Sequence, residues 1–439
     1  MAAASSTLKS IDRSDLPVLP ADWLWVQFSD TCDRVSVGHV GPTTEYFTDA
    51  PDGIRFLRSQ NVRPGKLEIK TALSITPAFH RKLKKSQLQA GDILFVRVGA
   101  NRGDCCVVPS GVGDLNCANI VFARPKEPTG FHAYFFQSVL GRSLLLSASV
   151  GAAQGVINTG SVANMPVPFP PLPVQRRIAG ILSAYDELIE NSQRRIKILE
   201  SMARALYREW FVHFRFPGHE SVPRIPSAIG EIPQGWEVST LGAHLSALES
   251  GKRPKGGIRE VEDGVPSIGA ENINGIGKHD FTGEKFIPRA FFQEMRKGIV
   301  RDRDVAIYKD GAYIGKSSYF RDGFPHLECC VNEHVFLLRA SGVRLRQTAL
   351  YLWLQEPDTV QTIRSKNANA AQPGINQQTV GGLELTLPDS QTAEQFDQLV
   401  DPLLAEVINL AKKIQNLRRT RDLLLPRLLS GQIDVEAIA

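Results

Sequence analysis

Apolar positions in the middle of the chain recur at the spacing of a long helix. Between residues 173 and 214 (PVQRRIAGILSAYDELIENSQRRIKILESMARALYREWFVHF), apolar side chains are three or four residues apart, with one interval of seven that passes polar Ser192. This heptad pattern is typical of a helix that packs along another long helix. About 36 helical residues would extend for roughly 54 Å, at about 1.5 Å per residue. The stripe consists of Ile178, Leu182, Tyr185, Ile189, Ile196, Leu199, Ala203, Leu206 and Trp210.

The same helix pattern occurs a second time near the C-terminus. The segment AAQGVIN at 152–158 recurs as AAQPGIN at 370–376, an offset of 370 − 152 = 218, and this offset aligns the first helix with residues from about 391 to 425. Pro402 interrupts the second helix early, and with Asp401 as a plausible N-cap the helix can restart there. The second stripe consists of Leu403, Val407, Leu410, Ile414, Leu417 and Leu424.

The repeat extends into the segments that precede the two helices. GDILFVRVGANRG at 91–103 matches RDVAIYKDGAYIG at 303–315, with an offset of 303 − 91 = 212. The smaller offset indicates insertions in loops, while the helix kept its length. Short β-type runs alternate with turns and short apolar helices, so we predict an α+β chain with two homologous mixed α/β domains. The predicted layout is a flexible leader at 1–14, a first domain at 15–172, a central helix at 173–217, a second domain at 218–390, and a C-terminal helix with its tail at 391–439.

The composition is that of a globular chain with a mild excess of basic residues. The 439 residues carry a formal net charge of +5, and the pI is near 8.8, which is compatible with an anionic partner such as nucleic acid. No run approaches the roughly 18 apolar residues that span a bilayer, and the first residues lack the apolar core of a signal peptide. The six cysteines show no metal-binding spacing. We therefore predict a cytoplasmic protein with reduced thiols and no membrane partner.

One segment resembles a phosphate-binding loop but does not fit it. GAYIGKS at 311–317 has three residues between its glycines, whereas the P-loop motif needs four. The first copy of the repeat has Asp104 where Lys316 stands, so the design does not require the lysine. We interpret the segment as a glycine-bearing turn after a strand.

A metal-dependent nuclease site is the second candidate for chemistry. Such a site could use Asp52 and Glu68 to hold Mg²⁺ and Lys70 to orient a water. The second copy has His279 and Phe281 in place of Glu68 and Lys70, so only the first domain could be active. No dinucleotide-binding, nucleophile-elbow or zinc-protease motif is present. The main prediction is therefore that the chain has no catalytic residues, no metal and no cofactor.

Polar and basic residues of both domains are candidates for contacts to DNA. Lys and Arg neutralise phosphates, and Arg, Asn and Gln can bond to two atoms of a guanine or adenine edge. The alternative is ordinary solvated surface or, for Asn158 and Asn376, capping of a turn. GKRPKGG at 251–257 is the best local candidate, because it is basic and rich in turn residues. The candidates are Arg55, Arg58, Asn61, Arg97, Asn101, Arg102, Asn119, Gln154 and Asn158 in the first domain, and Lys252, Arg253, Lys255, Asn272, Lys309, Tyr313, Lys316, Asn332, Gln372 and Asn376 in the second.

Two globular domains, each followed by a copy of the same long helix, resemble the specificity subunit of type I restriction-modification systems. The resemblance covers essentially the whole chain. Its most telling motifs are GDILFVRVG with RDVAIYKDGAYIG, AAQGVIN with AAQPGIN, PLPVQRRIAGIL at the start of the first helix, and LLLPRLLSGQIDV at 423–435.

This resemblance implies two target-recognition domains, each reading one half of a split site in double-stranded DNA. The helices would pair antiparallel as a coiled-coil spacer, in a pseudo-twofold arrangement that receives two methyltransferase subunits, with restriction subunits in the full complex. It also implies that this chain performs no catalysis. The helix pair would bring Ile189, Ile196 and Leu199 to Val407, Ile414 and Leu417 in reversed order.

Two other functions compete with this reading. One is a coiled-coil adaptor that binds proteins and never DNA. The other is a nuclease that uses Asp52, Glu68 and Lys70. The family has no fixed motif for its base-reading residues, so the resemblance assigns none.

Overall fold

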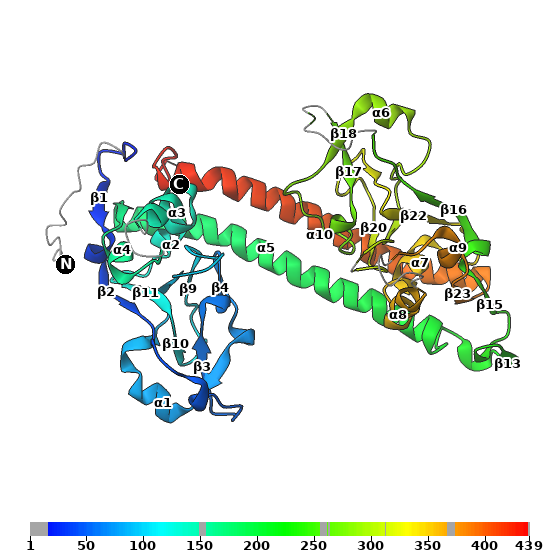
Figure 1. The fold of residues 1–439 in the computed structure, drawn as a ribbon, viewed down its shortest axis with the longest axis horizontal. Helices are drawn as coiled ribbons and strands as arrows, with labels where there is room; N and C mark the ends of the chain where they lie inside the picture. Colours follow the sequence, from blue (N-terminus) through cyan, green and yellow to red (C-terminus); the bar gives the residue numbers. More distant parts are fainter. Residues whose placement is uncertain are drawn as a thin grey trace. The chain divides into compact units, whose positions relative to one another are not determined.

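The chain divides into two compact units in the computed structural model (Figure 1). Unit 1 consists of Met1–Glu187 and Arg418–Ala439, and unit 2 consists of Leu188–Leu417. Within the described residues, no helix combines the length and the apolar character needed to cross a membrane. The structure describes residues 16–148, 155–254, 261, 264–311, 313–366 and 374–437.

Several predictions from the sequence lie outside the described residues. They are the leader at 1–14, the first residues of both AAQ repeats, and the candidates Gln154, Lys255 and Gln372.

Unit 1 is built on two four-stranded sheets. The first has the order β2-β11-β8-β9 with antiparallel neighbours, and the second has the order β6-β3-β10-β7, in which β3 and β10 are parallel. Two further antiparallel pairs join β1 to β12 and β4 to β5. The strands are β1 (Leu24–Gln27), β2 (Cys32–Val37), β3 (Ile54–Leu57), β4 (Val62–Arg63), β5 (Lys66–Leu67), β6 (Leu73–Ile75), β7 (Gln87–Leu88), β8 (Ile93–Val96), β9 (Cys105–Val107), β10 (Leu115–Cys117), β11 (Ile120–Pro125) and β12 (Pro166–Phe169).

Strand β8 shows how the first sheet organises this unit. All four of its side chains are buried. Ile93 and Phe95 pack into one apolar cluster, whereas Leu94 and Val96 pack into another. Successive side chains of a strand point to opposite faces, so both faces of the sheet are covered. The short helices of the unit are α1 (Pro77–Lys82), α2 (Phe131–Gln137), α3 (Val139–Ser147) and α4 (Thr159–Ala163).

Unit 2 repeats the strand order of unit 1. Its four-stranded sheet has the order β16-β22-β19-β20, and a three-stranded sheet has the order β18-β17-β21, in which β17 and β21 are parallel. β15 pairs with β23 as β1 pairs with β12, and β13 with β14 forms a hairpin. The elements are β13 (Arg224–Ser227), β14 (Gly230–Pro233), β15 (Glu237–Thr240), β16 (Leu245–Ser250), β17 (Gly264–Ile268), β18 (Phe286–Pro288), α6 (Arg289–Glu294), β19 (Val305–Tyr308), β20 (Ser317–Tyr319), β21 (Cys330–Val331), β22 (Val335–Ala340), α7 (Gln347–Trp353), α8 (Pro357–Ser365), α9 (Gln377–Gly381) and β23 (Glu384–Leu387).

Two long helices supply residues to both units. Helix α5 (Leu172–Tyr207) has 36 residues and continues as a π-helical turn over Arg208–Val212. It therefore ends before residue 217, and Phe214, with a φ of 55°, turns the chain away. Helix α10 (Ser390–Leu429) has 40 residues. Its first turn is capped by Asp389, whose Oδ1 accepts a hydrogen bond from the Thr392 amide at 2.9 Å.

The suggested restart of the second helix at Asp401 is wrong, because α10 is continuous through this position. Pro402 lacks an amide hydrogen, so the helix loses one backbone hydrogen bond there. Asp401 serves a different purpose: its carboxylate accepts bonds from Arg321 Nη1 at 2.6 Å and Nη2 at 3.0 Å, and from Arg303 Nη2 at 3.1 Å. These contacts tie the loop after β20 and the turn before β19 to the side of the helix.

Within unit 2, the residues of α5 and α10 run in opposite directions. Arg195 pairs with Glu406 at 2.8 Å, and further along α5 the ring of Tyr207 lies 6.1 Å from the ring of Phe396, centroid to centroid. The six residues of the expected seam belong to one hydrophobic cluster. In this cluster Ile189, Ile196, Val407 and Ile414 are buried, and Leu199 and Leu417 are partly buried.

The ends of the same helices pack in unit 1. Val174, Ile178 and Leu182 of α5 share a hydrophobic cluster with Leu428 and Leu429 of α10.

The ion pair between Arg321 and Asp401 generates a prediction about stability. The Arg321 side chain is only 9% exposed, so Asp401→Ala leaves a largely buried cation without its main partner. We expect a loss of about 3–5 kcal/mol, the range for breaking a buried pair. Urea unfolding followed by tryptophan fluorescence measures it. Glu406→Ala, which removes the exposed pair with Arg195, is the control and should cost less than about 1 kcal/mol. Equal losses in the two variants would contradict the role given to Asp401.

Candidate nucleic-acid interface

Three segments of unit 1 meet at one end of the sheet that contains β8. They are the turn at 97–104 between β8 and β9, Asn119 just before β11, and residues 155–158 before α4. The Ile157 amide donates to the Arg97 carbonyl at 3.1 Å, and Arg97 Nε returns a bond to the Ile157 carbonyl at 3.2 Å. Arg97 Nη1 also lies 3.5 Å from Asn119 Oδ1. A guanidinium and an amide are thus held at the ends of rigid strands.

Unit 2 joins the equivalent three segments in the same way. The Ile375 amide donates to the Lys309 carbonyl at 2.9 Å, which matches the bond between Ile157 and Arg97 in unit 1. The Lys309 amide donates to the His334 carbonyl at 3.1 Å. The Lys309 ammonium lies 4.9 Å from the centre of the Phe336 ring, a distance at which the ring attracts a cation. Each unit therefore presents a turn with a basic residue beside the segment before α4 or α9.

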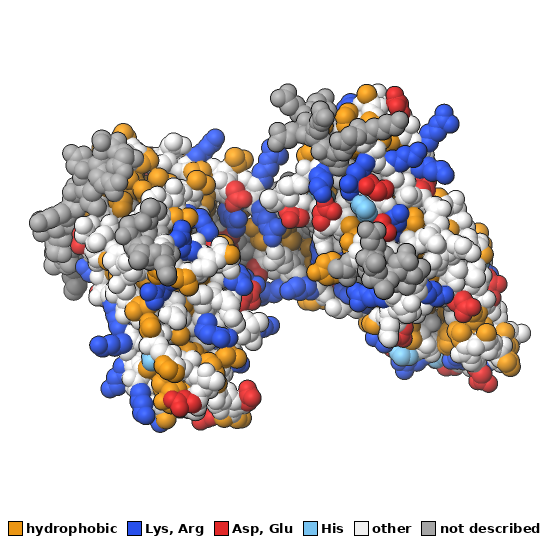
Figure 2. Space-filling model, in the orientation of Figure 1, with side chains coloured by type: hydrophobic (Ala, Val, Ile, Leu, Met, Phe, Trp, Pro, Cys, Tyr) orange, Lys and Arg blue, Asp and Glu red, His pale blue; other side chains and the backbone are white. Residues whose placement is uncertain are grey.

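Exposed groups that suit nucleic acid lie on these turns. In unit 2, Tyr313 is 57% exposed, and the Lys316 ammonium lies 4.3 Å from the centre of its ring. In unit 1, Asn101 and Asn119 are exposed, and Arg102 donates to the Gly155 carbonyl. On the face drawn in Figure 2, Lys and Arg side chains are spread over the surface of each unit, with acidic residues between them. Ammonium, guanidinium, amide and phenol groups are those that contact phosphates and base edges.

Acidic side chains partly neutralise the interface of unit 2. Arg253 pairs with Glu333 at 2.8 Å, and Asp310 lies 3.7 Å from Lys309 and 3.1 Å from His334. A phosphate that approached this surface would meet these carboxylates as well as the lysines. Lys252 and Lys316 are the exposed cations of this region whose described contacts include no carboxylate.

Two predicted DNA-contacting amides are buried, and for these the structure corrects the prediction. Asn61 is 0% exposed; its Oδ1 accepts from the Arg58 amide at 2.9 Å, and its Nδ2 donates to the Glu68 carbonyl at 3.1 Å. Asn332 is 2% exposed, and its Oδ1 accepts from the His334 amide at 2.9 Å. A buried polar group must be paired within the protein, and these amides shape turns. Neither is available to a base in this structure.

Asn158 and Asn376 act as helix caps, which is the alternative that the sequence left open. Asn158 Oδ1 accepts a hydrogen bond from the Ser161 amide at 2.8 Å, at the start of α4. Asn376 Oδ1 accepts one from the Thr379 amide at 2.8 Å, at the start of α9. Both side chains are exposed, so capping leaves their amide nitrogens at the surface.

The remaining candidates are Arg55, Arg58 and Asn272. Arg55 on β3 donates to the Ala72 carbonyl and to Ser74 Oγ, both at 3.3 Å. The buried Nε of Arg58 is among the atoms for which the described structure shows no partner. Asn272 donates to the Asp280 carbonyl at 3.1 Å. These residues lie in the second sheet of each unit or in its loops.

The residues of the nuclease hypothesis lie in two separate segments of unit 1. Glu68 pairs with Lys66 at 2.8 Å, Lys70 lies in the following turn, and Asp52 lies in the turn before β3. In the part of the chain that the structure describes, one group of three His, Cys, Asp or Glu residues is close enough to hold a metal: His279, Glu284 and His326.

That trio is a site that the sequence reasoning missed. The three residues are separated by as many as 47 positions, 326 − 279, and none stands in a metal-binding spacing. Burial lowers the pKa of His279. The cluster is recognisable only in the structure, where two loops bring these three side chains together.

All six cysteines are buried, and none forms a disulfide. Burial raises the pKa of the Cys330 thiol to about 11 and that of Cys32 to about 12. A thiol with such a pKa stays protonated near neutral pH and is a poor nucleophile.

The chain is similar to specificity proteins of type I restriction systems. Residues 56–201 match the family described as "Type I restriction modification DNA specificity domain". The chain is 24% identical over 308 residues to the type I restriction enzyme MjaIX specificity subunit of Methanocaldococcus jannaschii, covering 70% of this chain and 69% of that protein. The MjaVIII specificity subunit of the same organism is 28% identical over 233 residues, which is 53% of each chain.

A solved structure shares the fold. The type I restriction-modification system S subunit from M. genitalium matches with a TM-score of 0.59 and 16% sequence identity, covering 96% of this chain and 98% of that one.

The capping role of Asn376 generates a prediction. Asn376→Ala should destabilise the start of α9 by about 1 kcal/mol, whereas Asn376→Ser should be close to wild type, because serine caps a helix about as well as asparagine. Hydrogen exchange at the Thr379 amide is the measurement, since this amide loses its acceptor only in the alanine variant. Equal exchange in the two variants would argue against capping.

Proposed function

We propose that this chain is a specificity subunit of a type I restriction-modification system and reads a bipartite target in double-stranded DNA, which its similarity to such subunits supports. In this role it directs the methyltransferase and restriction subunits of the complex and performs no catalysis itself. The observation that carries the proposal is the duplication: both units join the same three segments beside the same sheet end, through the same backbone bond. Two similar readers in one chain are what a target of two half-sites requires.

Each unit would contact one half-site through the loops at its sheet end. Arg97, Arg102 and Asn119 are the proposed contacts in unit 1, and Lys309, Tyr313 and Lys316 are those in unit 2. Cations would hold phosphates and fix the register, while amides and the phenol would contact base edges. Asn101, Asn158, Lys252, Arg253 and Asn376 border these surfaces and remain candidates.

The two long helices would act as a spacer between the half-sites. The reversed direction of α5 and α10 within unit 2 supports an antiparallel coiled coil. The matching strand orders support a pseudo-twofold arrangement, and such an arrangement would offer equivalent docking places to two methyltransferase subunits.

Two competing functions make different demands. An adaptor without DNA contacts needs the helices but gives no reason for paired loops that carry Arg97 and Lys309 at matched positions. A nuclease needs Glu68 to hold a metal together with Asp52, whereas the Glu68 carboxylate pairs with Lys66.

Co-expression with a type I methyltransferase subunit, followed by mapping of modified adenines, tests the proposal directly. A split recognition sequence that depends on this chain is the expected result. Methylation that is the same without the chain would overturn the proposal.

Helix length generates a prediction about the gap between the half-sites. Inserting seven residues at equivalent places in α5 and α10 adds two turns, or about 10.5 Å, which corresponds to about three base pairs of DNA. We expect the non-specific gap to lengthen while both half-sites stay the same, as read by mapping of modified adenines. The same seven residues added after Ala439 are the control and should leave the gap unchanged. An unchanged gap in the helix variant would contradict the spacer role.

A single charge removal tests the interface of unit 2. Lys316→Gln should weaken DNA binding and reduce the dependence of log K on log salt by about one, because one phosphate contact is lost. Fluorescence anisotropy with a duplex that contains the mapped site, at several salt concentrations, measures this. Lys197→Gln removes an exposed charge from α5 in the same unit and should leave the slope unchanged. An equal change in both variants would indicate a general charge effect and count against this surface.

A further inference from the structure

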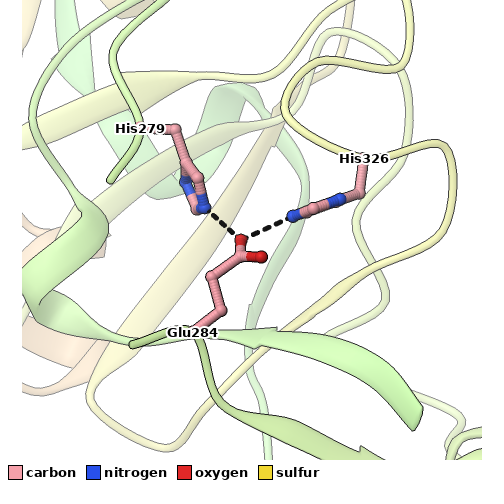
Figure 3. A group of neighbouring side chains, drawn as sticks. All are labelled: His279, Glu284 and His326. Atoms are coloured by element: carbon pink, nitrogen blue, oxygen red, sulfur yellow. Dashed lines mark hydrogen bonds and ion pairs between the residues drawn. The ribbon is translucent and has the colours of Figure 1, made fainter. Parts of the chain in front are cut away.

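Two imidazoles and one carboxylate converge in unit 2 (Figure 3). Glu284 Oε1 lies 2.5 Å from His279 Nε2 and 2.6 Å from His326 Nε2. One ligand atom from each residue falls within 4.8 Å of the other two. All three side chains therefore point at one position, from two different loops.

Burial makes this cluster different from a surface ion pair. The side chains of His279, Glu284 and His326 are 3%, 12% and 24% exposed. The ring of Phe281 lies 4.7 Å from the His279 ring and 5.7 Å from the His326 ring, centroid to centroid. A carboxylate removed from water in this way needs compensating positive charge, and a divalent cation supplies it at short range.

We propose that His279, Glu284 and His326 bind a divalent metal ion, with Zn²⁺ the ion of best fit. Two imidazole nitrogens and one carboxylate oxygen are a known zinc donor set, and Zn²⁺ completes its four ligands with a water molecule. The donor set contains no thiolate, and it has too few oxygens for Ca²⁺ or Mg²⁺, which prefer oxygen ligands throughout.

The two loops that carry the site are longer than their counterparts in unit 1. Between β17 and β18 the chain has 17 residues (269–285), against 15 (58–72) between β3 and β6. Between β20 and β21 it has ten (320–329), against seven (108–114) between β9 and β10. The repeat places Glu68 of unit 1 opposite His279. The shared fold thus forms without these ligands, and the site is an addition to unit 2.

The same two loops rest on helix α10, which gives the metal a structural role. Arg321, in the loop that carries His326, binds Asp401 of the helix, and the following residue, Asp322, accepts a bond from Lys412 through its carbonyl. Gly277, two residues before His279, packs so closely on α10 that a Cβ there would lie 3.1 Å from the Ala411 Cβ. A metal that joins the loops would therefore fasten the second sheet of unit 2 to its long helix.

Metal titration of the full chain tests the site without DNA, so the outcome does not depend on the proposed function. After removal of metals by a chelator, isothermal titration with Zn²⁺ should show one high-affinity ion per chain, and bound Zn²⁺ should raise the thermal unfolding midpoint. Co²⁺ in place of Zn²⁺ should give the visible absorption of a tetrahedral site. Absence of a high-affinity Zn²⁺ ion in the wild-type chain would overturn the proposal.

Variants assign the ion to these residues. His326→Ala and Glu284→Gln should each lower the Zn²⁺ affinity about 100-fold or more, because a ligand is lost. His244→Gln is the matched control. His244 lies 3.6 Å from Glu237, and the described residues place no third possible metal ligand beside this pair, so its loss should leave the Zn²⁺ affinity unchanged. Unchanged affinity in both ligand variants would overturn the assignment.

A cysteine variant separates loss of a ligand from loss of the fold. His326→Cys replaces one zinc ligand by another, so it should retain Zn²⁺ and, with Co²⁺, should add a near-ultraviolet band from the new thiolate bond. Co²⁺ bound without this band would show that the ion lies elsewhere and would overturn the proposal.

Discussion

The structure depends on burying the apolar stripes of two long helices. In unit 2, Phe396 of α10 is fully buried, and its ring lies 4.8 Å from that of Phe211 and 5.5 Å from that of Trp210. In unit 1, Ile178 and Leu182 of α5 are fully buried among side chains of α2 and of the C-terminal segment. Isolated helices owe little of their stability to propensity alone, so each unit and its part of the helix pair stabilise each other.

A duplicated scaffold allows its loops to diverge. The sheet order and the backbone bond from the segment before α4 or α9 are the same in both units, because they belong to the buried framework. The loops at the strand ends differ in length and charge between the two units, because insertions in surface loops cost little folding free energy. This division suits the proposed reading of two different half-sites. It also allows unit 2 to carry the His279, Glu284 and His326 cluster that unit 1 does not need.

The candidate contacts show how far residue type alone can predict function. Arg97 and Lys309 occupy matched positions, and the repeat in the sequence already paired them. Asn61 and Asn332 have the same chemistry as a base-reading amide, yet both are buried in turns. Sequence patterns report which groups are present, whereas burial decides which of them a partner can reach.

The sequence by itself determined the repeat, the helix spacing and the mixed domains, because all of these follow from periodicity and from matched segments along the chain. The continuity of α10 through Pro402, the cap roles of Asn158 and Asn376, and the cluster around Glu284 were decided by tertiary structure. Asp401 illustrates the reason: its side chain suits a cap, but the packed helix and the guanidinium of Arg321 offer it a stronger partner. Contacts between residues far apart in the chain override local preference wherever they bury more surface or pair more charge.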